Sequence, residues 1–87
     1  MSEDTLLEFP CQFPIKIMGN NTVDFENDIV VITRNHVPDL GEAAVTSRPS
    51  RTGKYLSVTV TFTATSKAQI DDLYRAMNAH PDVKMVL

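Results

Sequence analysis

The sequence predicts an α+β fold in which two helices cover one face of a four-stranded antiparallel sheet. Apolar residues alternate with polar ones at residues 11–19, 55–64 and 82–87, a pattern typical of half-buried strands. Two segments with helical spacing of apolar residues separate these strands. A weaker strand candidate at residues 43–48 completes the order βαββαβ. This order is that of a ferredoxin-like sandwich with right-handed crossovers and with the first and third strands central.

Length and composition indicate one globular domain. The chain has 87 residues, of which 43% are hydrophobic. We expect residues 1–10 to form an N-terminal tail and residues 11–87 to form a single βαββαβ domain. The acidic N-terminal stretch is not a signal peptide, no apolar run is long enough to span a membrane, and the single cysteine cannot form an internal disulfide. These features predict a cytoplasmic protein that does not bind membranes.

A period-two pattern predicts the first strand, and a helical pattern follows it. The apolar residues on one face of this strand are Phe13, Ile15 and Ile17. Thr22 is the expected N-cap of the first helix, and the apolar stripe of that helix begins at Phe25. The residue before a proline avoids the helical region, so the helix should end at Val37, before Pro38.

The second and third strands are expected to form a hairpin at the sheet edge. Pro49 directly follows the weak strand, and proline belongs on edge strands because it donates no ladder hydrogen bond. Gly53 lies in the connection and can adopt a positive φ. On the third strand, apolar side chains alternate with a row of hydroxyl side chains. This hydroxyl row consists of Tyr55, Ser57, Thr59, Thr61 and Thr63.

The last helix and strand complete the predicted core. Ser66 and Gln69 have the spacing of a capping box, which predicts the start of the second helix, and His80-Pro81 should end it. In the final strand, Val83, Met85 and Leu87 alternate with Lys84 and Val86. The side chains expected beneath the helices are Phe13, Ile15, Val58, Val60, Phe62 and Met85.

The sequence contains no recognisable catalytic or metal-binding constellation. His36 and His80 each lie beside a proline that ends a predicted helix, where an imidazole complements the helix dipole. Cys11 has no base near it in the sequence, and no cysteine or histidine spacing matches a zinc site. No glycine-rich phosphate loop is present. We therefore expect no enzymatic activity, no catalytic residues, no metal site and no cofactor.

Two features of the sequence are candidates for binding. Arg48, Arg51 and Lys54 place three cations within seven residues of the expected hairpin. They either form a solvated edge that discourages pairing between sheets or contact an anion or an acidic partner. The hydroxyl row is either wet or covered by a second subunit, which would give a homodimer through the sheet. Both pairs of alternatives stay open at the level of sequence.

RNA is the alternative partner. RNA-recognition domains have the same βαββαβ order and stack bases on aromatic residues of the central strands. Residues 53–58 resemble that motif faintly, but the second stacking position is Ser57. A net charge of −3 and a pI near 5.1 also disfavour a broad phosphate-binding surface. A module that binds single-stranded RNA through the open sheet face is therefore the less favoured prediction.

Three stretches together resemble the YbeD-like family of small bacterial proteins of unknown function. They are residues 6–10 with 16–19 (LLEFP and KIMG), residues 49–58 (PSRTGKYLSV) and residues 85–87 (MVL). The resemblance implies a cytosolic protein whose fold is similar to that of ACT regulatory domains, and it supplies no catalytic residues. ACT domains bind small effectors at the first strand–turn–helix, where a glycine lies. Gly19 and Asn20 hold that position here, and the amides of a helix N-terminus suit a ligand carboxylate.

We therefore expect a non-catalytic regulatory or interaction module that binds a small acidic metabolite or a protein partner. Because a single small domain is predicted, regulation of an enzyme would act in trans. Ser50 and Tyr55 join the candidate site because, with Pro49 and Gly53, they are expected to fix the shape of the hairpin. The candidate binding residues are Arg48, Ser50, Arg51, Lys54, Tyr55, Gly19 and Asn20.

Overall fold

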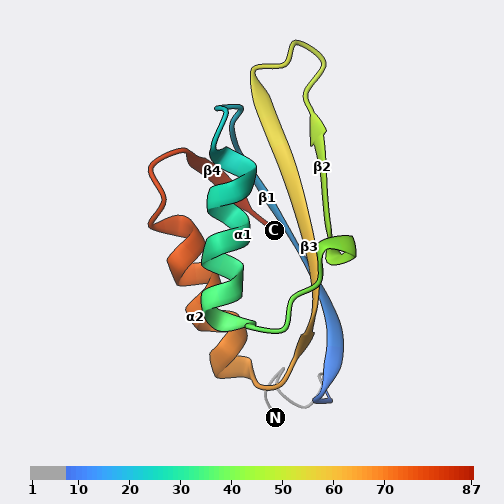
Figure 1. The fold of residues 1–87 in the computed structure, drawn as a ribbon. Coiled ribbons are helices and arrows are strands. Elements are labelled where there is room, and N and C mark those ends of the chain that lie inside the picture. The colour runs from blue at the N-terminus through green and yellow to red at the C-terminus, as the bar shows by residue number, and fades with distance from the viewer. Residues whose placement is uncertain (1–7) are drawn as a thin grey trace.

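A computed structural model describes residues 8–87 and has the predicted element order (Figure 1). The strands are β1 (Cys11–Asn20), β2 (Val45–Pro49), β3 (Tyr55–Ala64) and β4 (Val83–Val86). The helices are α1 (Phe25–His36) and α2 (Lys67–Asn78), and a short 3₁₀ turn, η2 (Glu42–Ala44), precedes β2. Of the predicted tail, residues 1–7 lie outside the described residues, whereas Phe9 packs against the core.

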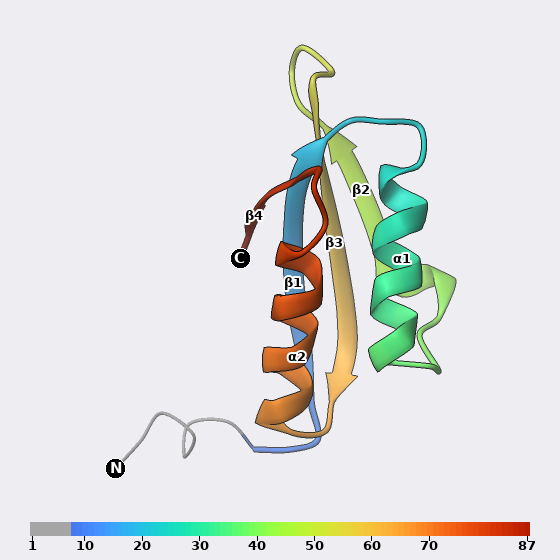
Figure 2. The same ribbon diagram turned by 90° about the vertical axis from the view of Figure 1, so that its left-hand side faces the viewer.

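The four strands form one antiparallel sheet in the order β2-β3-β1-β4. β1 and β3 are therefore central, as predicted, and they pair along ten residues each. Both helices lie on one face of the sheet, which leaves the opposite face open (Figure 1). Figure 2, seen from the helix side, shows α2 in front of β1 and α1 on the side of β2. The prediction of a ferredoxin-like sandwich is confirmed.

The core lies between the helices and the sheet. Alternation along β3 turns Val58, Val60 and Phe62 toward the helices and the hydroxyl row toward the open face, as predicted. Phe62 also makes an edge-to-face contact with the half-buried Phe13, with ring centroids 6.0 Å apart. The side chains with 0% exposure include Ile15, Ile17, Phe25, Ile29, Val58, Val60, Leu73 and Met77.

The prediction that Met85 lies in the core is wrong. Met18 pairs with Met85, but the next residue of β1, Gly19, pairs with Val83, so Lys84 is an extra residue in β4. This bulge shifts the alternation of β4 by one position. Val83 and Val86 consequently pack against the core, and the Met85 side chain is 48% exposed.

The sequence predicted the N-cap of α2 correctly, but its prediction for the N-cap of α1 was wrong. Asp24, not Thr22, is the N-cap of α1, and its side chain makes no capping hydrogen bond. At α2 the predicted capping box is confirmed, because the backbone N–H of Gln69 donates to Oγ of Ser66 at 3.1 Å. The Gln69 side chain also donates to the carbonyl of His36 at 3.0 Å, which joins the start of α2 to the end of α1.

The turn between β1 and α1 is packed against the loop between α2 and β4. Gly19 is buried, and a Cβ at this position would lie 2.5 Å from Cζ of Phe25 and also against the Asp82 carbonyl oxygen. The Asn20 backbone N–H donates to that carbonyl at 2.9 Å, and the Asn20 side-chain amide donates to Oδ1 of Asp82 at 3.0 Å. Glycine at position 19 is therefore required by close packing.

His80 holds the same loop in place. Its Nδ1 accepts a hydrogen bond from the Asp82 backbone N–H at 3.0 Å, so the ring hydrogen lies on Nε2. Nε2 lies 3.0 Å from Oδ2 of Asp28 on α1 and donates to it. The imidazole also meets the Phe25 ring edge to face, with centroids 5.8 Å apart. This geometry gives His80 a structural role that links α1, α2 and β4.

Replacing Val60 by aspartate should unfold the domain. The Val60 side chain has 0% exposure, and burying an unpaired carboxylate there would remove most of a stability of about 5–10 kcal/mol. Amide dispersion in a ¹H–¹⁵N correlation spectrum and urea denaturation measure the effect. Thr63→Asp is the matched control, since Thr63 is exposed on the open face of the same strand. Native dispersion in the Val60→Asp protein would mean that the two sheet faces are assigned the wrong way round.

Gly19→Ala should lower the free energy of unfolding by about 1–3 kcal/mol, because the added methyl overpacks the contact with Phe25 and Asp82. Gly41→Ala is the control, since a Cβ at position 41 would meet nothing within 4 Å. We expect that control to change stability by less than about 0.5 kcal/mol. Equal urea midpoints for the two variants would contradict the packing role of Gly19.

Candidate functional site

The strands of the sheet and the β2–β3 hairpin carry net positive charge although the chain as a whole is acidic. β1, β4 and the β2–β3 hairpin together contain five cations and no aspartate or glutamate. Since the net charge of the chain is −3, the remaining residues together carry −8. The cations are Lys16, Arg48, Arg51, Lys54 and Lys84. Charge is therefore separated between the sheet and the rest of the molecule, which the overall pI does not reveal.

Lys16 on the central strand β1 and Arg48 on the edge strand β2 have no carboxylate partner among the described side chains. Among residues 8–41 and 43–87, neither of them forms a salt bridge, and both side chains are exposed. On α2, by contrast, Lys67 and Arg75 lie 2.9 and 2.7 Å from neighbouring carboxylates. The positive charge of the sheet face is thus available to an external anion, whereas that of α2 is neutralised locally.

Strand register brings Lys16 and Arg48 to opposite sides of a hollow on the open face, here called the basic hollow. Thr59 lies between Lys16 and Thr46 in the sheet, and Ser57 lies next to Arg48. The hollow has a volume of about 320 Å³ and is lined by Lys16, Thr46, Ser47, Arg48, Ser57 and Thr59. Ammonium, guanidinium and hydroxyl groups all donate hydrogen bonds, and the lining contains no anionic side chain. The Ser47 hydroxyl is not available to a ligand, because it already donates to Oε1 of Glu26 on α1 at 3.2 Å. The remaining groups suit a carboxylate or a phosphate.

A second hollow adjoins the first toward the hairpin, and we call it the apolar hollow. It has a volume of about 170 Å³ and is lined by Met18, Arg48, Pro49, Ser50, Tyr55 and Ser57. Arg48 and Ser57 therefore belong to both hollows. The thioether of Met18, the ring of Pro49 and the half-buried ring of Tyr55 give its wall an apolar character.

The structure brings together three of the residues that the sequence nominated. Arg48, Ser50 and Tyr55 line the apolar hollow, whereas Arg51 and Lys54 lie in the exposed hairpin connection. The Tyr55 backbone N–H donates to Oγ of Ser50 at 3.1 Å, so Ser50 helps to shape the hairpin as expected. Nζ of Lys54 lies 5.4 Å from the centroid of the Tyr55 ring, within the range of a cation–π contact.

Gly19 and Asn20 are not part of either hollow. Gly19 is buried beneath the loop that contains Asp82, and the Asn20 amide is already bonded to the Asp82 carboxylate. A role for these two residues in ligand binding stays a prediction, and we base no site on them.

The candidate binding residues chosen from the sequence leave out five residues of the basic hollow. They are Lys16, Thr46, Ser47, Ser57 and Thr59. Alternation alone placed Lys16 and the hydroxyl row on the open face. Their combination with Arg48 depends on the register between β1, β3 and β2, because Lys16 and Thr59 pair across strands that are far apart in the sequence.

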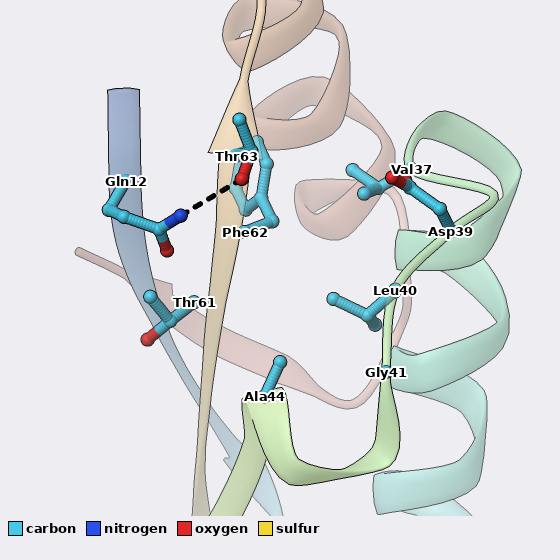
Figure 3. Close-up of a pocket in the computed structure, with 9 residues that line it drawn as sticks. All are labelled: Gln12, Val37, Asp39, Leu40, Gly41, Ala44, Thr61, Phe62 and Thr63. Atoms are coloured by element: carbon cyan, nitrogen blue, oxygen red, sulfur yellow. Dashed lines mark hydrogen bonds between the residues drawn. The ribbon is translucent and has the colours of Figure 1, made fainter. Parts of the chain in front are cut away.

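A third hollow is lined mainly by apolar and uncharged polar residues (Figure 3). It has a volume of about 180 Å³ and lies where β3 extends beyond the end of β2. A hydrogen bond of 2.9 Å from Gln12 to Thr63 crosses from β1 to β3 at its rim. Its lining contains no cation and includes Val37, Leu40, Ala44 and Phe62. The only charged group of its lining is Asp39, so this hollow does not suit an anion.

The described residues show no assembled catalytic or metal centre. Both ring nitrogens of His80 are engaged by aspartate residues, so neither is free to accept a proton from a nucleophile. Within residues 8–87 no three histidine, cysteine, aspartate or glutamate side chains are grouped as metal ligands. Burial raises the pKa of the Tyr74 phenol on α2 above its ordinary value, which already lies well above neutral pH. Neither described helix is long and apolar enough to cross a bilayer.

Comparisons with known proteins agree with this description. Residues 4–87 match the family model described as "Protein of unknown function (DUF493)". The chain is 45% identical over 87 residues to a UPF0250 protein of Nitrosomonas europaea, and the match covers 100% of both chains. It is 49% identical over 82 residues to a UPF0250 protein of Chromobacterium violaceum, covering 94% of this chain and 92% of the relative.

A solved structure supports the fold. The solution structure of protein HP0495 from Helicobacter pylori matches with a TM-score of 0.72 and 13% identity, covering 100% of this chain and 94% of that one. At this identity the likeness concerns the fold alone. The matches in sequence extend over nearly the whole chain and confirm the resemblance inferred from its motifs. The chain belongs to the DUF493 family, the YbeD-like UPF0250 proteins of bacteria, whose function is unknown.

Proposed function

We propose that this chain is a non-catalytic cytosolic module that binds a small acidic metabolite in the basic hollow and regulates a partner protein in trans. One observation carries the proposal: Lys16 and Arg48 flank a hydroxyl-lined hollow on a face whose strands contain no carboxylate side chain. The geometry supplies donors for an anion and no catalytic group beside them.

The energetic argument depends on several groups acting together. A single ion pair at the surface contributes only about 0.2–1 kcal/mol, because water screens it. In the basic hollow a guanidinium can bind two oxygens of the same anion, and the half-buried hydroxyls of Ser57 and Thr59 lie between the cations. A dissociation constant of about 1 mM corresponds to about 4 kcal/mol, so it requires about 1 kcal/mol from each of these four groups.

A protein partner would extend over a larger part of the same face. Arg51 and Lys54 continue the positive surface beyond Arg48 into the exposed hairpin, so an acidic surface fits it by charge. A symmetric dimer packed sheet to sheet would instead bring two copies of Lys16 and Arg48 close together. Such a dimer would need bound anions between the sheets, so we favour a different, acidic partner.

Single-stranded RNA is the second candidate, and the acid-free sheet face favours it more than the overall pI does. The argument against RNA is the lack of stacking partners, since a nucleobase stacks on aromatic side chains. On the open face of the described strands, Tyr55 is the single aromatic side chain, because Phe13 and Phe62 pack in the core. We therefore rank RNA below a small anion.

Lys16→Met and Arg48→Met should each weaken binding of inorganic phosphate about five- to tenfold, because each removes one of the two cations. Chemical shifts of the open-face amides during a phosphate titration measure the dissociation constant. Arg34→Met is the matched control, since Arg34 is an exposed cation on α1 that does not line the basic hollow. Raising the salt concentration should weaken phosphate binding by the wild type as well.

The control defines the outcome that contradicts the proposal. An equal effect of Arg34→Met and Arg48→Met would indicate a nonspecific response to net charge. A parallel titration with a twelve-residue oligouridylate tests the second candidate. Binding much tighter than that of phosphate, and lost in Tyr55→Ser, would replace the metabolite by RNA as the ligand.

A further inference from the structure

We infer that the ligand is an amphipathic anion, whose acidic head binds in the basic hollow and whose compact apolar body lies in the apolar hollow beside Tyr55. This inference rests on the proposed anion site and adds the chemistry of the second half of the ligand. A simple inorganic ion would fill only the first half.

The two hollows form one continuous surface. Arg48 and Ser57 line both of them, so no side chain separates the basic part from the apolar part. Along β3, the row of Thr59 and the row of Ser57 are two residues apart, and Tyr55 is two residues further. Successive rows on one face of a strand are about 7 Å apart. The Ser57 and Tyr55 rows are one such spacing apart, so a ligand whose head group contacts Arg48 and Ser57 has the length to place one ring beside Tyr55.

The lining of the second hollow determines what it accepts. Met18, Pro49 and Tyr55 contribute apolar atoms to this lining, and Tyr55 lies at its hairpin end. The hydroxyl of Ser50 already accepts a hydrogen bond from the Tyr55 backbone N–H, so one lone pair of that hydroxyl is used. Apart from Arg48, the lining includes no charged residue. The hollow therefore favours an apolar group over a second anionic group.

Size limits the apolar body. The apolar hollow measures about 170 Å³, close to the cavities of about 150 Å³ that accept benzene in protein interiors. One six-membered ring or a short branched alkyl group fits, and a long chain would extend beyond it. Because the hollow is open to solvent, the apolar body contributes a moderate gain in affinity rather than tight binding.

Lys54 helps to hold the Tyr55 ring, which forms part of the wall of the apolar hollow, in one position. Its ammonium lies 5.4 Å from the Tyr55 ring centroid, and this contact favours one position of the ring. The Tyr55 backbone is in turn tied to Ser50 by two hydrogen bonds of 2.8 and 3.1 Å. A ring held in this way can contact a ligand with little loss of side-chain freedom.

The test compares phenyl phosphate with inorganic phosphate by the same amide titration of the full chain. We expect phenyl phosphate to bind the wild type about tenfold more tightly, which is the gain for burying most of one ring face. Tyr55→Ser should reduce that ratio to about one or two, because it removes the ring that the phenyl group contacts. Arg48→Met should weaken both ligands. Benzoate, titrated in parallel, distinguishes a carboxylate head from a phosphate head.

The possible failures are distinguishable. Binding of inorganic phosphate with no preference for phenyl phosphate would overturn this inference and leave the anion site intact. Absence of binding by both ligands would overturn the proposed function and the inference with it. Met18→Thr provides a second removal of the apolar wall should Tyr55→Ser disturb the hairpin. A phenyl preference that survives both substitutions would also overturn the inference.

Discussion

The structure depends on the ten-residue pairing of β1 with β3, in which every second side chain of β3 is buried. Burial of Val58, Val60 and Phe62 supplies the sheet side of the core. Because successive side chains of a strand point to opposite faces, this burial forces Ser57 and Thr59 onto the open face. The hydroxyl floor of the basic hollow is therefore a direct consequence of the alternation that makes the core. The same pairing sets Lys16 opposite Thr59.

The separation of charge follows from which elements carry the acids. The two helices contain Glu26, Asp28, Asp71 and Asp72, and the α2 pair neutralises neighbouring cations. The strands contain no acid, so their cations have no such partner in the described part of the chain. A net charge of −3 consequently coexists with a positive sheet face. The local electrostatic field, not the overall charge, decides which ligands approach a given face. The acidic pI was therefore a poor argument against a surface that binds phosphate groups.

The sequence was sufficient to predict the fold and the hairpin part of the site. Alternation and the capping box predicted β1, β3 and α2, and proline predicted the edge position of β2. The exposure of Met85 could not be predicted, because a bulge at Lys84 is a property of the pairing with Met18 and Gly19. The basic hollow joins residues from β1, β2 and β3, so it required the register of three strands. Arg48, Ser50 and Tyr55 were found because they lie within one hairpin, whereas Lys16 lies on another strand.

The turn that resemblance to ACT domains singled out is engaged by the chain itself. The Asn20 backbone N–H donates to the Asp82 backbone carbonyl, and the Asn20 side-chain amide donates to the Asp82 carboxylate, so both donors of Asn20 are already used within the chain. His80 holds this loop by a contact with Asp28, and Gly19 allows Phe25 to pack beneath it. Opening the turn to a ligand would break several of these contacts together. The sheet face needs no such rearrangement, because its cations and hydroxyls are already exposed or half-buried. Within this fold, the same strand β1 therefore stabilises the core with its inward residues and offers Lys16 and Met18 to a ligand on the other face.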